Sequence, residues 1–511
     1  MIKYNTEGKM VNVYPVTPIA IDCNDYKVKV NGKEVQTNCA RVSREPFNRR
    51  WPGHQRSIEQ TELVQFLSLE CDEAVDIEIT PGEPFDKDKL VIRPLSLGIV
   101  PTVTDDGTIK LRLEKAAYLS VEPFGRNRAF HIFADEVKDY GVDKNDPNVI
   151  YFGAGEHDAG DIVLSSGQTL FVDAGAVVYA NVYAYEADNI RILGRGILDN
   201  SKKREVILFE ANVENNYSAV KNAKREHFVR IECCKNVLID GVTLRDSLTY
   251  NIRPYCCHKI EIRNVKLIGN WRYNSDGIDM HNCDGVLIEN CFIRTYDDSI
   301  CVKGRENTGY IADANGLEGS SRSIEYFKNV RVRGCTLWND WGKVLEIGAE
   351  TCADEIYDVV FEDCDIIHVT MSPLDCNNVD YADVHGLIYR NINVEYDDVI
   401  PQPKIQPNDS ARYEDMDVDK NFNPPLIWCA VQFHKEYSGG GTRRGKNRDF
   451  LFENIRLISN KPPRFFFKGF DSEHGCDGMV IRNVTWNGEK VTQLTDENLV
   501  ADEFCKNIIL E

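Results

Sequence analysis

The sequence predicts an all-β protein in which a right-handed parallel β-helix follows an N-terminal β-sandwich. Three observations predict this fold. Short β-rich phrases repeat from about residue 150, Asn, Asp and Gly separate them, and residues 1–145 show strands without the repeat. A chain of 511 residues exceeds one ordinary core, whereas a repeat fold extends along an axis without limit. We therefore expect a sandwich domain over 1–145, a catalytic β-helix over 146–490, and a tail over 491–511 that packs on or caps the helix.

The N-terminal segment alternates apolar and polar residues over short runs bounded by turn residues. Such alternation with Gly, Pro and Asp at the turns is typical of antiparallel sheets, and several such strands in sequence favour a sandwich. The runs are AVDIEI (74–79), KLVIRP (89–94), TIKLRL (108–113) and AYLSVE (117–122).

The repeating phrases share one pattern, in which alternating apolar residues surround an Asn, Asp or Gly. They are NIRILGRGIL (189–198), NVLIDGVTL (236–244), KIEIRNVKL (259–267), GVLIENCFI (285–293), NVRVRGCTL (329–337), DVVFEDCDI (358–366), GLIYRNINV (386–394), DFLFENIRL (449–457) and GMVIRNVTW (478–486). Several phrase starts lie 23 to 29 residues apart, a period that indicates a β-solenoid; the Leu/Asn template of leucine-rich repeats is absent. Cys291, Cys335 and Cys364 recur at one phrase position, which predicts a stacked inner ladder.

Composition excludes several classes of partner. The net charge of −21 argues against nucleic acid and anionic membranes, which bind clustered Lys and Arg. The sequence begins without a signal-peptide pattern and contains no apolar run long enough to cross a bilayer. The 17 cysteines form no zinc-type pairs, so we expect buried free thiols and a cytoplasmic location.

Two phrases concentrate carboxylates: YNSDGIDMHNCDGVLIEN (273–290) and RTYDDSICVKG (294–304). Asp276 and Asp297 are 21 residues apart, about one coil, and neighbouring coils stack at roughly 4.8 Å. The two phrases should therefore lie on adjacent rungs of one sheet. Consecutive strand residues face opposite sides, so Asp297 and Asp298 can both face outward only where the backbone bends.

Three clustered carboxylates suit glycoside hydrolysis. Their mutual repulsion raises at least one pKa and holds a proton for a general acid, while an ionised partner activates water. Inverting enzymes separate the two groups by about 6.5–9.5 Å and retaining enzymes by about 5–5.5 Å, and the sequence leaves both open. Two alternatives remain: a calcium site, and turn capping, the role we expect for Asp279, Asp284 and Asp363.

These motifs resemble those of the polygalacturonases (glycoside hydrolase family 28) and the related dextranases (family 49). The Asn-Thr-Asp and Gly-Asp-Asp motifs of family 28 correspond to Asn274-Ser275-Asp276 and Tyr296-Asp297-Asp298. The resemblance implies that Asp297 is the general acid and that Asp276 and Asp298 hold and deprotonate the water. It also implies inversion at the anomeric carbon, with no metal and no organic cofactor.

The chain departs from the polygalacturonase pattern elsewhere. The stretch matching Gly-His-Gly is LWNDWGKVLEIGAET (337–351), in which Trp341 stands where His is expected, and the uronate-gripping Arg-Ile-Lys is missing. The layout is closer to that of the dextranases, which also place a sandwich before the helix. Their junction resembles residues 117–136 followed by 148–180.

Seven further residues are candidates for substrate binding because they flank the motifs or lie within a few coils of them. For each, packing, ion pairing or surface solvation is the competing interpretation. They are Arg253, Trp271, Lys303, Trp341, Glu346, Glu350 and Asp380.

We therefore expect a glycosidase that cleaves α-linked oligo- or polysaccharides, exo-acting with inversion, with loops 305–322 and 397–430 closing one end of a groove. The alternatives are a hydrolase of uronate-containing pectic oligosaccharides, a non-catalytic glycan-binding β-helix, and a polysaccharide lyase. Sugar, linkage and oligomeric state stay open.

Overall fold

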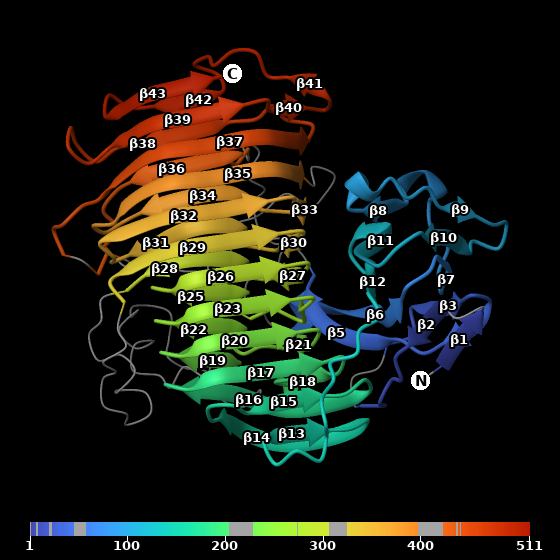
Figure 1. Ribbon diagram of the computed structural model, residues 1–511. Coiled ribbons are helices and arrows are strands. Elements are labelled where there is room, and N and C mark those ends of the chain that lie inside the picture. The colour runs from blue at the N-terminus through green and yellow to red at the C-terminus, as the bar shows by residue number, and fades with distance from the viewer. Residues whose placement is uncertain are drawn as a thin grey trace.

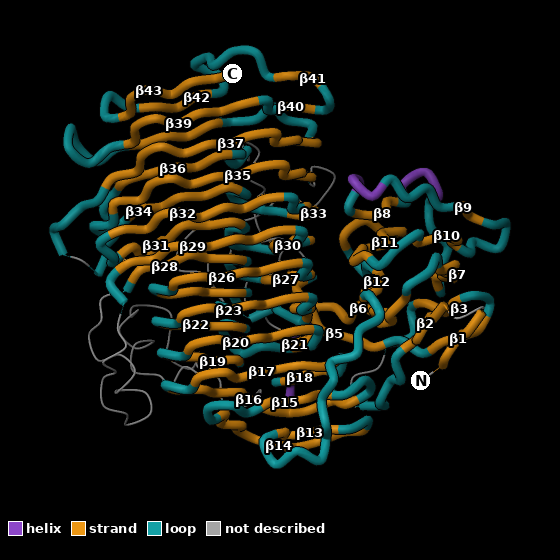
Figure 2. Tube along the Cα trace, in the orientation of Figure 1, coloured by secondary structure: helices purple, strands orange, loops and turns teal. Residues whose placement is uncertain are grey.

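The computed structural model describes residues 2–6, 9–19, 23–44, 58–203, 228–272, 274–305, 324–396, 423–435, 438–439 and 441–511. Strands dominate these ranges (Figures 1 and 2). The helices among them are single 3-10 turns: η1 (Ile58–Gln60), η2 (Lys87–Lys89), η3 (Leu95–Leu97) and η4 (Ser201–Lys203). None of the described helices is long and apolar enough to cross a membrane.

Two sheets form the N-terminal domain. One is β1 (Ile2–Thr6), β2 (Lys9–Val13), β6 (Thr61–Cys71), β12 (Phe130–Asp135), β11 (Ala117–Arg126) and β8 (Val91–Arg93), with β5 (Asn38–Ser43) paired to β6. The other is β4 (Lys33–Val35), β3 (Tyr26–Val30), β7 (Val75–Pro81), β10 (Ile109–Leu113) and β9 (Thr102–Val103). One buried cluster takes residues from both sheets, including Leu69 and Ile132 from the first and Ile77 and Ile109 from the second. The sheets therefore enclose a common core, as the sequence predicts.

The rest of the chain winds into a right-handed parallel β-helix with three faces. Face A is β13 (Val149–Phe152), β15 (Thr169–Val172), β17 (Asp188–Gly194), β20 (Lys235–Asp240), β23 (His258–Arg263), β26 (Asp284–Glu289), β29 (Tyr326–Arg333), β32 (Glu355–Glu362), β35 (Asp383–Glu395), β37 (Lys446–Ile458), β39 (Cys476–Arg482) and β43 (Cys505–Leu510).

Face B is β14 (Gly155–Leu164), β16 (Ala176–Tyr185), β19 (Val229–Glu232), β22 (Ile252–Tyr255), β25 (Ile278–His281), β28 (Ile300–Gly304), β31 (Leu345–Thr351), β34 (Leu374–Asn378), β36 (Ile427–Val431), β38 (Phe465–Lys468) and β42 (Leu499–Ala501). Face C is β18 (Ile197–Asp199), β21 (Thr243–Arg245), β24 (Lys266–Ile268), β27 (Phe292–Thr295), β30 (Thr336–Asn339), β33 (Asp365–His368) and β40 (Thr485–Trp486), together with the ends of β35 and β37; β41 (Glu489–Lys490) pairs antiparallel with β40.

The repeating phrases are the strands of face A. Ile260 pairs with Val286, Val286 with Val330, and Val330 with Val359, so apolar residues at one phrase position stack into the core. The predicted cysteine ladder is confirmed, since Cys291, Cys335 and Cys364 are all buried in the core cluster. Each coil thus buries its apolar residues against the next coil, and no coil has a core of its own.

The last residues continue the helix. Strands β42 and β43 pair with β38 and β39, so the tail beyond residue 490 supplies the final coil. The loops that the sequence assigns to groove closure, 305–322 and 397–430, lie mostly outside the described residues.

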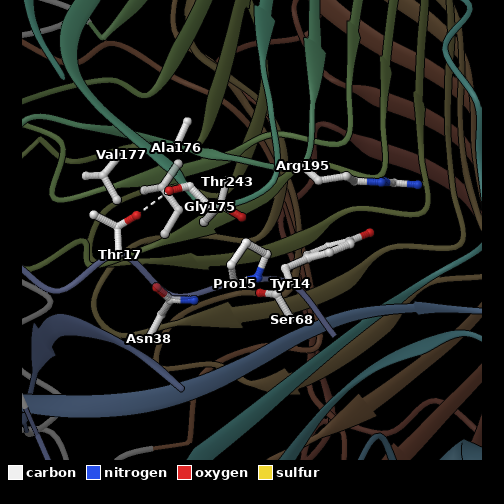
Figure 3. Close-up of a pocket in the computed structure, with 11 residues that line it drawn as sticks. Tyr14, Pro15, Thr17, Asn38, Ser68, Gly175, Ala176, Val177, Arg195 and Thr243 are labelled. Atoms are coloured by element: carbon white, nitrogen blue, oxygen red, sulfur yellow. Dashed lines mark hydrogen bonds between the residues drawn. The ribbon is translucent and has the colours of Figure 1, made fainter. Parts of the chain in front are cut away.

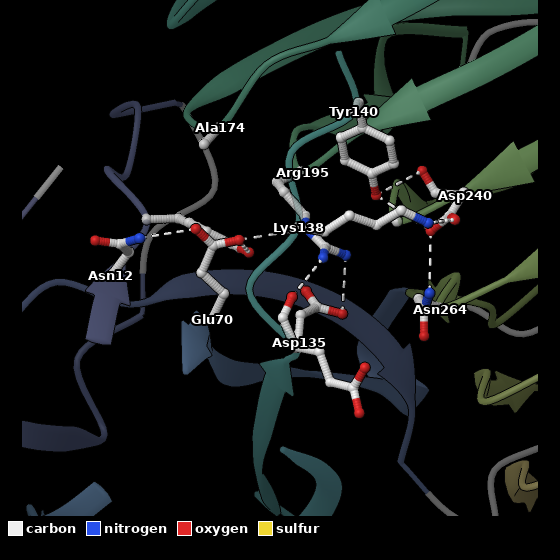
Figure 4. Close-up of polar contacts among 12 residues, drawn as sticks. Asn12, Glu70, Asp135, Lys138, Tyr140, Ala174, Arg195, Asp240 and Asn264 are labelled. Carbon is white, nitrogen blue, oxygen red and sulfur yellow. Dashed lines mark hydrogen bonds and ion pairs between the residues drawn. The ribbon is translucent and has the colours of Figure 1, made fainter. Parts of the chain in front are cut away.

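The sandwich packs against face C. Phe66 and Phe133 from the sandwich share a buried cluster with Phe292 and Trp338 from face C. Charged groups join the same interface, since the buried Lys266 ammonium lies 3.0 Å from Asp135. Lys138 pairs with Asp240 at 2.5 Å (Figure 4). Face C is therefore covered by the first domain.

A small pocket lies at the edge of this interface, where the segment between β2 and β3 meets the first coils (Figure 3). Tyr14, Pro15 and Gly175 line it, and the hydroxyl of Thr17 donates to the Gly175 carbonyl. A side chain at Gly175 would meet Pro15 at 2.6 Å, so glycine permits the close approach. The lining includes no residue of the two aspartate phrases.

One cysteine pair differs from the sequence expectation. Cys23 and Cys39 are joined by a disulfide within the N-terminal domain, whereas the other 15 cysteines are free. The expectation of free thiols throughout is therefore wrong for this pair, whose members lie only 16 residues apart and meet because the chain folds back on itself.

Candidate active site

The three predicted aspartates meet at the edge of face B. Asp276 precedes β25, and the Asp297–Asp298 pair lies in the bend between β27 and β28. Backbone bonds from Gly277 N to Asp298 O and from Ile278 N to Ser299 O set the two segments on adjacent rungs. One oxygen from each of the three carboxylates lies within 4.8 Å of the others. The expected bend is present, and it lets both consecutive aspartates join the cluster.

A buried lysine lies at the centre of the acidic groups. The Lys303 ammonium, on β28, is 2.7 Å from Asp279, 3.7 Å from Asp276 and 3.9 Å from Asp298. Its fourth carboxylate is Glu350, at 3.8 Å. The prediction that Asp279 only caps a turn is wrong, because β25 carries it into the site, fully buried, on a strand level with Cys301.

Burial and the neighbouring carboxylates both raise the pKa of two of the aspartates. Burial, reinforced by Asp279 and Asp297, raises the pKa of Asp276 well above its usual value. Burial and the adjacent Asp298 do the same to the pKa of Asp297. Two carboxyl groups with raised pKa values therefore lie beside each other, an arrangement suited to acid–base chemistry.

Glu350 behaves in the opposite way. Burial by itself would raise its pKa, but the charges of Lys303 and Arg305, whose guanidinium lies 2.9 Å away, lower the pKa to about 2. Glu350 is thus ionised at neutral pH and is the outer counter-charge of Lys303.

A second lysine holds the other flank of the aspartates. The Lys343 backbone N–H donates to Asp298 Oδ1 at 2.9 Å, and its ammonium pairs with Glu346 and, at 3.6 Å, with Asp375. Burial raises the pKa of Asp375 to about 7, with Lys343 opposing the rise. The carboxylate row therefore extends upward from Asp298 over two further rungs.

Buried asparagines fix the backbone of both aspartate segments. The Asn339 amide donates to the Asp297 carbonyl at 2.7 Å and accepts from the Trp341 N–H at 3.1 Å. On the preceding coil, the Asn251 side-chain amide donates to the Asp276 carbonyl at 2.7 Å. The Asn339 bond satisfies the buried Asp297 carbonyl, whereas the Asp276 carbonyl also accepts from the Asn251 backbone N–H at 2.9 Å. Both asparagines thereby hold the aspartate segments in place.

The remaining predicted binding residues are distributed around this centre. Lys303, Glu346 and Glu350 belong to it. Arg253 is buried against Glu232 at 2.9 Å, and the register of β22 with β25 sets it level with Asp279. Asp380, fully buried, accepts from the Thr351 N–H at 2.9 Å.

The two tryptophans are both buried. Trp271 donates its indole N–H to Asp246 at 3.0 Å, under the Arg272 guanidinium. Trp341 stacks on Tyr296 with centroids 5.9 Å apart. In the stretch that the sequence compares with Gly-His-Gly, the residue that contacts Asp298 is Lys343, a role that sequence reasoning missed.

The cluster also offers ligands for a cation. Oxygens of Asp276, Asp297 and Asp298 converge, as do Asp298, Cys301 and Glu346. The chain itself, however, supplies positive charge to these groups through Lys303 and Lys343. These two lysines therefore neutralise part of the negative charge of the cluster.

Comparison with known proteins supports the fold and the family resemblance. Residues 172–402 match the profile of glycosyl hydrolases family 28. A polygalacturonase from Gossypium barbadense is 26% identical over 165 residues, which are 30% of this chain and 39% of that protein. A probable polygalacturonase from Vitis vinifera is 24% identical over 260 residues, 46% of this chain and 50% of that protein. The chain thus covers half or less of the length of these relatives.

The solved structure of Dex49A from Penicillium minioluteum shares the fold over nearly the whole chain. It superposes with a TM-score of 0.54 at 15% identity, covering 97% of this chain and 90% of the other. This coverage includes the sandwich as well as the β-helix. The resemblance inferred from the sequence is therefore confirmed: residues 172–402 match glycosyl hydrolases family 28, and the chain shares the fold of Dex49A over nearly its whole length.

Proposed function

We propose that this protein hydrolyses α-glycosidic bonds of oligo- or polysaccharides with Asp297 as general acid and Asp276 and Asp298 as the groups that position and deprotonate water. The observation that carries the proposal is the convergence of the three carboxylates within 4.8 Å on adjacent rungs. The raised pKa of Asp297, caused by burial and by Asp298, supports its role as proton donor. The family 28 resemblance supports the same assignment.

Inversion rests on the family resemblance. The nearest carboxylate oxygens are closer than the about 6.5–9.5 Å typical of an acid and base that enclose a water, so distance alone does not select inversion. The anomer that is released first distinguishes inversion from retention. An α-linked substrate followed by NMR should give the β-anomer first, and the α-anomer would show retention.

The charge of the site favours a neutral substrate over a uronate. Lys303 is already surrounded by four carboxylates, and Lys343 by Glu346 and Asp375. A uronate carboxylate would add a further negative charge to this cluster. Parallel assays on α-glucan and galacturonate oligosaccharides test this: faster turnover of the neutral series is expected, and a preference for galacturonate would contradict it.

We also propose exo-action, the release of sugar from one end of the chain. Product profiles from a hexasaccharide distinguish the two modes. Early appearance of a single short product supports exo-action, whereas early mid-chain fragments contradict it.

A glycan-binding protein without catalysis is the second candidate, favoured by the same cluster of acidic, hydrogen-bonding side chains. Asp297→Asn separates the two, because it abolishes turnover only if Asp297 donates the proton. A lyase is disfavoured: burial lowers the pKa of Lys303, but Asp279 and Tyr250 outweigh it and raise the pKa well above the usual value, so the ammonium is a poor base.

A further inference from the structure

An outward-facing row of side chains runs along face B through the site. Residues of consecutive strands pair in register from Glu346 to Asp375, then to Trp428 and then to Phe466. Their strand neighbours, such as Ile427 and Phe465, point into the core cluster, so this row points outward. The row therefore joins the carboxylates to a pair of aromatic rings.

The two rings form a stack close to the carboxylates. The Trp428 and Phe466 centroids are 3.9 Å apart with an interplanar angle of 11°, and both side chains are partly exposed. At a spacing of roughly 4.8 Å per rung, Trp428 lies two rungs, or about 10 Å, from Glu346 along the helix axis.

The stack leaves one face of the indole directed at the site. Phe466 is on the rung beyond Trp428 and covers that face, so the opposite face is turned toward the rung of Asp375. Among the described residues, no aromatic ring other than Phe466 stacks on Trp428. An apolar face beside a row of carboxylate acceptors matches a pyranose ring, which has an apolar C–H face and a rim of hydroxyl donors.

We propose that Trp428, backed by Phe466, is a sugar-stacking subsite on the C-terminal side of the catalytic carboxylates, which binds a neutral pyranose unit next to those being cleaved. The inference rests on the proposed function for its link to hydrolysis. Asp375, the carboxylate of the row next to Trp428, then accepts a hydrogen bond from a hydroxyl group of the bound glycan. The row thereby sets the direction of the bound chain along the helix axis.

Kinetics on a series of α-linked glucose oligosaccharides, from disaccharide to hexasaccharide, tests the subsite. Trp428→Ala should raise KM roughly three- to tenfold for the longer members with little change in kcat, because ring stacking contributes about 0.5–1.5 kcal/mol. Trp428→Phe should keep most of the affinity. An unchanged dependence of KM on chain length in Trp428→Ala would overturn the subsite.

A binding readout separates the subsite from the hydrolysis. In an Asp297→Asn background, the same oligosaccharides should change the tryptophan fluorescence; this change should vanish in Trp428→Phe and persist in the control Trp486→Phe on β40. A change that survives Trp428→Phe would overturn the subsite. Quenching through Trp428 by a protein that hydrolyses none of these glycans would support the subsite while refuting the proposed function.

Discussion

Lys303 is the group whose removal should disturb the site most. Its ammonium is almost fully buried and lies within 4 Å of four carboxylates, with Asp279 the closest at 2.7 Å. Lys303→Met preserves the length and the apolar stem of the side chain but removes the charge. Four acidic groups are then left without their common partner.

The expected cost follows from the distances. At an effective dielectric constant of about 20, unit charges 3.8 Å apart, as for Lys303 and the ionised Glu350, attract by roughly 4.4 kcal/mol. Breaking one side of a buried ion pair typically costs about 3–5 kcal/mol. We therefore expect Lys303→Met to lower the free energy of unfolding by about 3–5 kcal/mol at neutral pH. The loss should shrink as the pH falls toward about 2, where Glu350 also becomes protonated in the folded state.

Catalysis should change in a defined direction as well. Lys303 lowers the pKa of both Asp276 and Asp297, which burial raises, so its removal raises both values further. Both limbs of the pH–rate profile should therefore move toward higher pH.

Urea denaturation across pH and the pH dependence of kcat/KM on one α-linked oligosaccharide measure these effects. Lys303→Arg, which keeps the charge, should lose less on both measures. Lys328→Met is the matched control, since Lys328 lies 3.6 Å from Asp284 at the surface, where such a pair contributes about 0–1 kcal/mol. A folded Lys303→Met protein with wild-type stability and an unmoved pH profile would refute the electrostatic reasoning.

Three further predictions address single groups. Asp297→Asn should lower kcat by about 100- to 10,000-fold with an unchanged circular dichroism spectrum, and retained turnover would remove Asp297 from the role of general acid. Glu350, with its pKa lowered to about 2, stabilises the fold above its unfolded pKa of about 4.3, and this contribution disappears as the pH falls through about 2. Glu350→Gln should therefore cost up to about 3 kcal/mol at neutral pH and almost nothing near pH 2, as thermal melts across that range would show; an equal cost at both pH values would contradict it. Asn339→Ala leaves the buried Asp297 carbonyl unsatisfied, so it should lower the free energy of unfolding by about 1–3 kcal/mol and also lower activity. Asn391→Ala, which removes an exposed side-chain bond to Asp363, is the control and should lower stability less. Equal losses in the two variants would argue against a special role for Asn339.

Part of the architecture was predictable because the coils of a parallel β-helix appear in the sequence as a repeating pattern. The phrases beginning at 236, 259 and 285 are consecutive strands of face A, paired Val237 to Ile260 and Ile260 to Val286. The same period set the spacing between the two aspartate segments. Alternation and period are local properties of the sequence, so they can be recognised without the tertiary structure.

The charge partners could not be predicted in the same way. Lys303 was a candidate because it follows the second aspartate phrase, but its contact with Glu350 depends on the next coil. Asp279 looked like one of many turn residues until the register of β25 and β28 brought it to Lys303. The sequence analysis considered Trp341 and did not predict the contact between Lys343 and Asp298.

The sequence by itself determined the β-helix, its N-terminal sandwich and the three aspartates, because coil length and alternation are fixed along the chain. Only the tertiary structure decided which groups neutralise those aspartates and that the sandwich covers face C and not face B. The physical reason is that electrostatic pairing and domain packing act across rungs and between domains. They are set by stacking register and by which face is buried, and neither can be read from residues adjacent in sequence.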